Sequence, residues 1–99
     1  MVHEMMVALT VTDGAKYQAY REAMAPILAD YGGGFRYDFD IARVLKSASD
    51  HAINRVFTIY FGDRDKKDGF FADARYREVK AKFFEASVSG TTIVGAWDR

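Results

Sequence analysis

The chain has 99 residues, and its 14 lysines and arginines balance its 14 aspartates and glutamates. No basic tract of the kind that neutralises phosphates is present, so nucleic acid is not expected as a partner. The absence of cysteine excludes disulfides, thiolate catalysis and cysteine-ligated zinc. No stretch approaches about 18 consecutive apolar residues and the first residues lack signal-peptide features. We therefore expect no membrane partner and a cytoplasmic protein.

The predicted elements begin with a strand over residues 2–11, where apolar and polar residues alternate. Residues 14–31 are predicted to form a helix, because apolar residues recur there at steps of three and four. Pro26 lies inside this segment and predicts a kink or a break. Gly32 can take the left-handed conformation that ends a helix.

Two further strands are predicted over residues 35–46 and 53–61, joined as an antiparallel hairpin by the turn-forming residues 47–52. A helical segment over 64–86 follows. It is predicted to be divided, because Asp73 can cap a second helix.

Residues 90–98 form the last predicted strand. The order β-α-β-β-α-β predicts an α+β, ferredoxin-like fold, with a four-stranded antiparallel sheet and two helices on one face. We expect a single domain of this fold over residues 1–99.

The alternation within 35–46 predicts which side chains face the helices. The apolar set that should face them, with Phe39 opposite Ile59, comprises Phe35, Tyr37, Phe39 and Ile41. The polar set that should face away, beside its neighbours on strand 53–61, comprises Arg36, Asp38, Asp40, Thr58 and Tyr60.

The polar set is the candidate ligand-binding site. A homodimer that stacks two sheets would enclose it in a partly wet cavity, where charges must be paired, hydrated or bound to a ligand. Arg36 would hold an anionic or carbonyl oxygen of the ligand. Carboxylates in the cavity that are not paired with Arg36 would have raised pKa values and could act as bases. The alternative is salt bridging within the interface without chemistry.

Neither histidine suggests a metal or haem ligand. His3 lies at the start of the first strand and His51 in a loop, and both are predicted to be exposed. We therefore expect no metal and no other cofactor. A Ser-His-Asp triad built from Asp50, His51 and either Ser47 or Ser49 is disfavoured, because loops commonly have this composition. Tyr17 and Tyr20 are predicted to be packing residues.

Two segments resemble the domain-of-unknown-function 1330 (DUF1330) family. They are "YQAYREAMAPILADYGG" (17–33) and "FFADARY" (70–76), which is similar to the family's Phe-x-x-Ser-Pro-x-Tyr segment, although Ala74 stands where the family usually has proline. The resemblance covers nearly the whole chain. It implies the dimeric α+β barrel superfamily, and hence a homodimer, but no activity.

That superfamily also includes haem-degrading monooxygenases, cofactor-free quinone-forming monooxygenases, muconolactone isomerases and polyketide cyclases, and such an analogy is associational. Two functional classes therefore stay open. One is an enzyme or binding protein for a small organic molecule in the sheet-face cavity. The other is a non-catalytic dimeric structural or interaction module.

Overall fold

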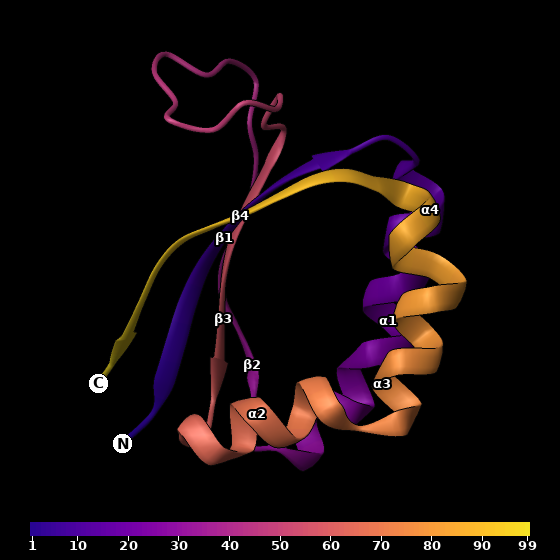
Figure 1. The fold of residues 1–99 in the computed structure, drawn as a ribbon, viewed down its shortest axis with the longest axis vertical. Helices are drawn as coiled ribbons and strands as arrows, with labels where there is room; N and C mark the ends of the chain where they lie inside the picture. Colours follow the sequence, from indigo (N-terminus) through magenta and orange to yellow (C-terminus); the bar gives the residue numbers. More distant parts are fainter.

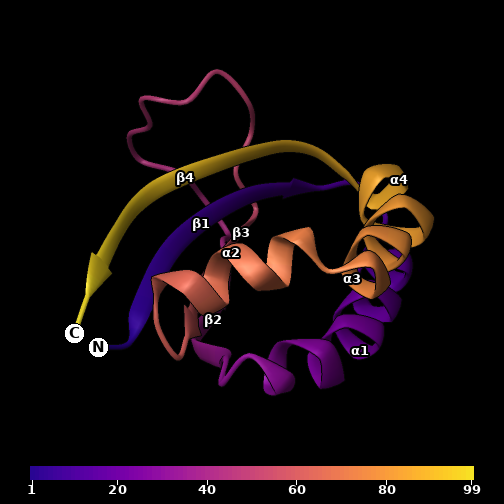
Figure 2. The same ribbon diagram turned by 60° about the horizontal axis from the view of Figure 1, so that its bottom comes forward.

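The computed structural model describes residues 1–99 and contains a four-stranded antiparallel sheet with all helices on one side (Figures 1 and 2). The elements in chain order are β1 (His3–Val11), α1 (Gly14–Asp30), β2 (Gly34–Asp40), β3 (Arg55–Phe61), α2 (Arg64–Ala72), α3 (Ala74–Val79), the π-helical turn η1 (Lys80–Phe84), α4 (Glu85–Ser87) and β4 (Val88–Asp98). The strand order β2-β3-β1-β4 confirms the predicted ferredoxin-like fold. None of these helices combines the length and apolar character needed to cross a membrane.

The hairpin between β2 and β3 is less regular than predicted. β2 ends at Asp40, and residues 41–54 form a long loop in place of a longer strand and a short turn. The Ile41 N–H still donates to the Asn54 carbonyl at 2.9 Å. Beyond that bond the chain leaves the sheet, and Figure 1 shows the loop above one end of the strands.

Glycine ends α1 as the sequence predicts. Gly32 has a φ of +66°, in the left-handed region that side chains with a Cβ rarely adopt. Its N–H donates to the Ala29 carbonyl at 3.0 Å, and the Gly33 N–H donates to the Leu28 carbonyl at 3.1 Å, which is the Schellman pattern. Pro26 lies inside a helix that is assigned continuously to Asp30, so the chain does not break there.

The second helical segment is divided at Asp73, also as predicted. The Asp73 side chain accepts the Arg75 N–H at 2.8 Å and caps the start of α3. The chain then passes through the π-helical turn η1, where the Glu85 N–H donates to the Lys80 carbonyl. Such wide turns are rare in proteins, and those that occur often lie at functional sites.

The hydrophobic core lies between the sheet and the helices. Aromatic rings supply much of it, and the Phe70 and Tyr76 ring centroids are 4.3 Å apart. The buried cluster comprises Met5, Val7, Leu9, Tyr17, Tyr20, Met24, Ile27, Leu28, Phe57, Ile59, Phe61, Phe70 and Tyr76.

A β-bulge at Arg36 changes which face of the sheet each later residue of β2 occupies. Phe35 lies opposite Ile59, and Tyr37 lies opposite Thr58, so two steps along β2 correspond to one step along β3. Arg36 is therefore the extra residue between two consecutive pairs. Because successive side chains point to opposite faces, one extra residue reverses the sides of everything that follows.

The predicted register of β2 is consequently wrong. Phe39 lies opposite Val56 and not opposite Ile59, so its ring lies on the face without helices. Asp38 lies opposite the buried Phe57, on the face that the helices cover. A regular alternation would have required the reverse arrangement.

Candidate functional site

The structure brings together three of the five predicted site residues, Arg36, Thr58 and Tyr60. They lie on the sheet face without helices, which we call the open face. The Arg36 Nε donates to the Glu4 carboxylate at 3.0 Å, and the Thr58 hydroxyl accepts the Tyr37 N–H at 3.1 Å. Arg36, which was expected to hold a ligand oxygen, thus binds a carboxylate of its own chain.

Glu4 belongs to this group through its bond to Arg36, although it was not among the five predicted ligand-binding residues. Its side chain is fully buried and accepts hydrogen bonds from Arg36 and from Arg99 at the end of the chain. Burial raises the pKa of Glu4, but the hydrogen bonds from Arg99 and Arg36 outweigh it and hold this pKa below its ordinary value. Glu4 is therefore a paired anion and a poor base. A carboxylate within an otherwise apolar strand was the available signal.

Asp38 and Asp40 lie on the other side of the sheet, so the expectation that all three charges of β2 share one face is wrong. Asp38 accepts paired hydrogen bonds from Arg55, both at 2.8 Å, and from Arg21 at 3.1 and 3.3 Å. Burial raises the pKa of Asp38, yet the two guanidinium groups lower it overall. Asp40 is 93 % exposed and lies 3.8 Å from Arg55.

The ion pair between Arg21 of α1 and Asp38 of β2 connects this helix to the sheet. The Arg21 guanidinium lies 3.9 Å from the ring centroid of Phe35 and 4.6 Å from that of Phe57. Its Nε also donates to the Tyr17 hydroxyl at 2.8 Å. A flat cation stacked on two rings and paired with a carboxylate fills a structural position, and we assign this cluster to stability.

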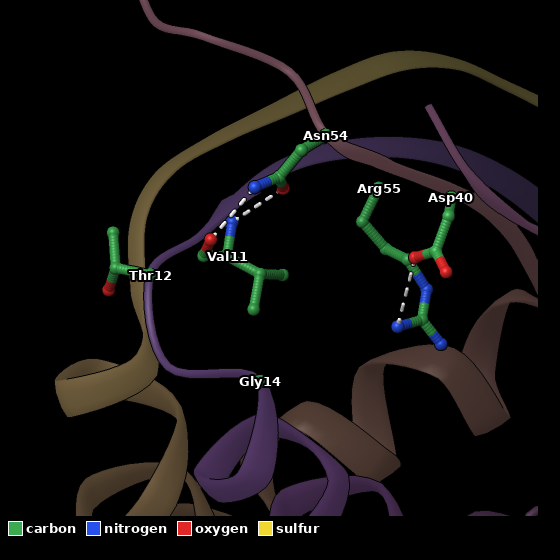
Figure 3. Close-up of a pocket in the computed structure, with 6 residues that line it drawn as sticks. All are labelled: Val11, Thr12, Gly14, Asp40, Asn54 and Arg55. Atoms are coloured by element: carbon green, nitrogen blue, oxygen red, sulfur yellow. Dashed lines mark hydrogen bonds and ion pairs between the residues drawn. The ribbon is translucent and has the colours of Figure 1, made fainter. Parts of the chain in front are cut away.

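Two larger cavities are present, and neither lies on the open face. The first has a volume of about 370 Å³ and is lined by Val11, Thr12, Gly14, Asp40, Asn54 and Arg55. In Figure 3 its polar side chains form pairs: Asn54 bonds the N–H and carbonyl of Val11, both at 2.8 Å, and Arg55 pairs with Asp40. Its polar groups are already satisfied, and only one lining residue is hydrophobic.

The second cavity has a volume of about 300 Å³ and lies between the sheet and the helices. Strands β1, β3 and β4 form one wall, and α1, α2, α3 and η1 form the other. Ten of its twelve lining residues are hydrophobic, in contrast to the first cavity. They line it together with Lys80 and Thr91, and the full set is Met5, Val7, Leu9, Tyr20, Phe57, Ile59, Phe71, Tyr76, Lys80, Phe84, Thr91 and Ile93.

This second cavity has a buried floor and an exposed mouth. Leu9 is fully buried and Tyr76 is 4 % exposed. By contrast, Ile93 is 58 % exposed and Phe71 is 39 % exposed, and Lys80 is exposed as well. The cavity therefore opens to solvent between the edge strand β4 and the second helical segment.

Two hydroxyl groups are the polar feature of the floor. The Tyr20 and Tyr76 oxygens are 2.9 Å apart and share a hydrogen bond. Burial raises the pKa of both phenols, so both stay protonated at neutral pH. From the sequence, Tyr20 was expected to be a packing residue, and its pairing with Tyr76 was not predicted. Both residues lie in the two segments that carry the family resemblance, which was the signal available.

The turn η1 shapes one wall of the same cavity. It places Lys80 at the mouth and Phe84 beside Tyr20, with 5.0 Å between the ring centroids of the latter two. The π-helical turn η1 therefore forms part of the cavity wall.

Neither histidine lies in this cavity. The prediction that His3 is exposed is wrong: it is 5 % exposed, and its Nδ1 lies 2.8 Å from Asp98. His51 is half-buried, with its two ring nitrogens 2.8 Å from the Thr10 hydroxyl and 2.7 Å from the Thr92 hydroxyl. Its partners are threonines and not the neighbouring aspartate. No cluster of three or more side chains suited to a metal ion is present.

Comparison with known proteins supports the fold but supplies no activity. The family model described as "Domain of unknown function (DUF1330)" matches residues 5–97. No curated protein matches the sequence. The RPA0582 protein of unknown function from Rhodopseudomonas palustris has a TM-score of 0.81 at 19% identity, over 99% of this chain and 82% of that one.

Two other solved structures are similar over nearly the whole chain. A dimeric ferredoxin-like protein of unknown function from Jannaschia sp. CCS1 has a TM-score of 0.60 at 14% identity, over 100% of both chains. SnoaB from Streptomyces nogalater, a cofactor-independent oxygenase, has a TM-score of 0.64 at 15% identity, over 99% of this chain and 92% of that one. At such identities the likeness concerns the fold alone.

Proposed function

We propose that this chain, which belongs to the DUF1330 family of unknown function, is a homodimeric protein that binds a small organic molecule in the cavity between its sheet and helices. The lining of that cavity carries the proposal. Ligand pockets are typically apolar with a few placed polar groups, and this cavity combines ten hydrophobic residues with a buried pair of phenols. Its volume of about 300 Å³ lies at the lower end of the range for ligand pockets.

The proposed site lies on the opposite face of the sheet from the one predicted by sequence. Arg36 and Asp38 are each paired with charged groups of the chain, so neither offers a free charge to a ligand. The ligand role first assigned to Arg36, Asp38, Asp40, Thr58 and Tyr60 stays a prediction, and the cavity is the better-supported site.

The open face is the proposed homodimer interface. The rings of Tyr37 and Phe39 stack on it with centroids 6.0 Å apart, and they are 49 % and 51 % exposed. Exposed aromatic groups on an uncovered sheet face are typical of interaction surfaces. The similar protein from Jannaschia is dimeric, which supports a dimer. The cytoplasmic location expected from the sequence stays a prediction.

The proposal is one of binding and names no reaction. SnoaB is an oxygenase, but a shared fold hosts unrelated activities. The residues that line the cavity define a binding space and not a reaction. The non-catalytic interaction module is the alternative. The dimer interface alone supports it, and it predicts that the cavity binds nothing.

The proposal is tested by closing the mouth of the cavity. We expect small aromatic probes to perturb amide resonances of residues around the cavity in the wild-type protein, and Ile93→Trp to abolish these shifts. Ile93 is 58 % exposed at the mouth, so a larger side chain there should not disturb the core. The control is Val44→Trp, in the loop and 40 % exposed. Probes that bind nowhere, or equally to the Ile93→Trp protein, would refute the proposal.

A further inference from the structure

We infer that the cavity selects neutral carbonyl compounds, aryl ketones or aldehydes, by hydrogen bonding their oxygen to the Tyr20–Tyr76 pair. The inference rests on the proposed function, because it names the ligand class of the same cavity. Its basis is that the two hydroxyls carry two protons and their shared hydrogen bond uses one of them.

The pair has one more proton than it uses. A phenol carries one O–H donor and two acceptor lone pairs. The bond between the Tyr20 and Tyr76 oxygens, 2.9 Å long, is the hydrogen bond that both hydroxyls make, and it uses one of the two protons. The second O–H has no other protein acceptor, and both tyrosines line the cavity. A buried donor without a partner is unfavourable, so an acceptor oxygen in the cavity would be bound.

Either hydroxyl can donate the shared bond. In both arrangements one phenol accepts that bond and is free to direct its own O–H elsewhere. Burial raises the pKa of both phenols, so both keep their protons at neutral pH. Accepting one hydrogen bond also makes the second phenol a stronger donor.

The depth of the pair explains why the ligand oxygen should be neutral. Tyr20 is 5 % exposed and Tyr76 is 4 % exposed, whereas Lys80, the cation that lines the cavity, is exposed at its mouth. A carboxylate at the floor would be desolvated without a counter-charge. A carbonyl oxygen accepts one or two hydrogen bonds without that penalty, and the surrounding rings and aliphatic groups accommodate its apolar body.

The test compares acetophenone with ethylbenzene, which differ in replacing the carbonyl by a methylene. We measure the dissociation constants of both compounds for the wild type and for the double variant Tyr20→Phe/Tyr76→Phe. For each protein we divide the dissociation constant of ethylbenzene by that of acetophenone. Because a hydrogen bond contributes about 0.5–1.5 kcal/mol net, this ratio should fall about two- to thirteenfold in the double variant. Tyr17→Phe is the control: its hydroxyl bonds Arg21 and does not line the cavity, so the ratio should stay as in the wild type.

Infrared spectroscopy of the wild type gives an independent readout that needs no variant. The carbonyl stretch of bound acetophenone should lie at lower frequency than in an apolar solvent, as for a hydrogen-bonded ketone. An unshifted stretch, an unchanged ratio in the double variant, or tighter binding of benzoate than of acetophenone would overturn the inference. In the first two cases both probes still bind, so the proposed function stands. Failure of every probe to bind would refute the proposed function itself.

Discussion

The hydroxyls of Tyr20 and Tyr76 are each other's partners, so removing one and removing both should have different effects on stability. Either single Tyr→Phe change breaks the shared bond and leaves one buried hydroxyl alone, and we expect it to cost about 1 kcal/mol. The double change removes both polar groups and should cost no more than either single change. Urea unfolding of the four proteins gives the coupling directly, and strictly additive costs would contradict the pairing.

Asp38 and Asp40 are matched residues for testing the Arg21 cluster, because they lie on one strand and face the same side. Asp38→Ala leaves Arg21, whose side chain is 10 % exposed, with an unpaired charge against two rings. We expect a loss of about 1–3 kcal/mol in unfolding free energy. Asp40→Ala should change it by less than about 0.5 kcal/mol, since Asp40 is 93 % exposed. Equal effects would show that Asp38 is no more structural than a surface charge.

At the scale of the element, the end of α1 depends on a single backbone conformation. Gly32→Ala places a Cβ on a residue with φ +66°, and we expect a loss of about 1–2 kcal/mol. Gly14→Ala is the control at the other end of the helix, where an added Cβ meets nothing within 4 Å. It should be neutral or slightly stabilising, because alanine favours helices. Thermal unfolding of the two variants measures both effects. Similar shifts in Tm would contradict the role assigned to Gly32 at the end of α1.

Local signals made these element ends predictable. Gly32 and Asp73 act through bonds to residues a few positions away, so their types and positions in the sequence were sufficient. The bulge at Arg36 was not predictable in this way. Arg36 bonds Glu4, 32 residues distant along the chain, and the alternation around it is typical of a regular strand. One unforeseen residue therefore moved Asp38 and Asp40 out of the predicted site.

The cavity was hidden for a related reason. The sequence predicted that Tyr20 packs in the core, since hydrophobic periodicity shows which side of a helix is buried. Whether buried rings fill a space or leave part of it empty depends on how Tyr20, Tyr76 and Phe84 pack across three elements. Periodicity contains no information on that packing.

For the whole molecule, the paired carboxylates predict a loss of stability in acid. The pKa of Glu4 is lowered in the folded state, so its contribution is complete above the unfolded value of about 4 and is lost as the pH falls through the lower folded value. We expect the urea midpoint to fall steeply below about pH 4, and Glu4→Gln to flatten this fall while lowering stability at pH 7.

Glu22→Gln is the matched control for this acid profile. Glu22 is exposed on α1 and accepts a hydrogen bond from Gln18 at 3.4 Å, and the neighbouring Arg21 pairs with Asp38 instead. Its profile should follow that of the wild type. If Glu4→Gln also followed the wild type, the buried pair would not be the source of the acid sensitivity.

The proposed homodimer predicts a difference between two exposed apolar residues on opposite faces of the sheet. Phe39→Asp, on the open face, should convert the dimer to a monomer by light scattering at micromolar concentration, because it places a charge in the interface. Ile93→Asp, on the helical face and 58 % exposed, should remain dimeric. A monomeric wild type, or dissociation of the Ile93→Asp protein alone, would contradict the assignment of the interface.

Both outer strands of the sheet are irregular, which limits how copies of this protein can aggregate. β2 is interrupted at Arg36, and β4 breaks register with β1 at two points. Fibre growth needs a long, flat edge on which another strand can continue the hydrogen-bond ladder, and bulges are a known means of denying it. The aromatic stretch of β2 would otherwise be a fibre-forming hazard. The bulge that displaces two aspartates thus also protects the exposed edge, and association is left to the faces of the sheet.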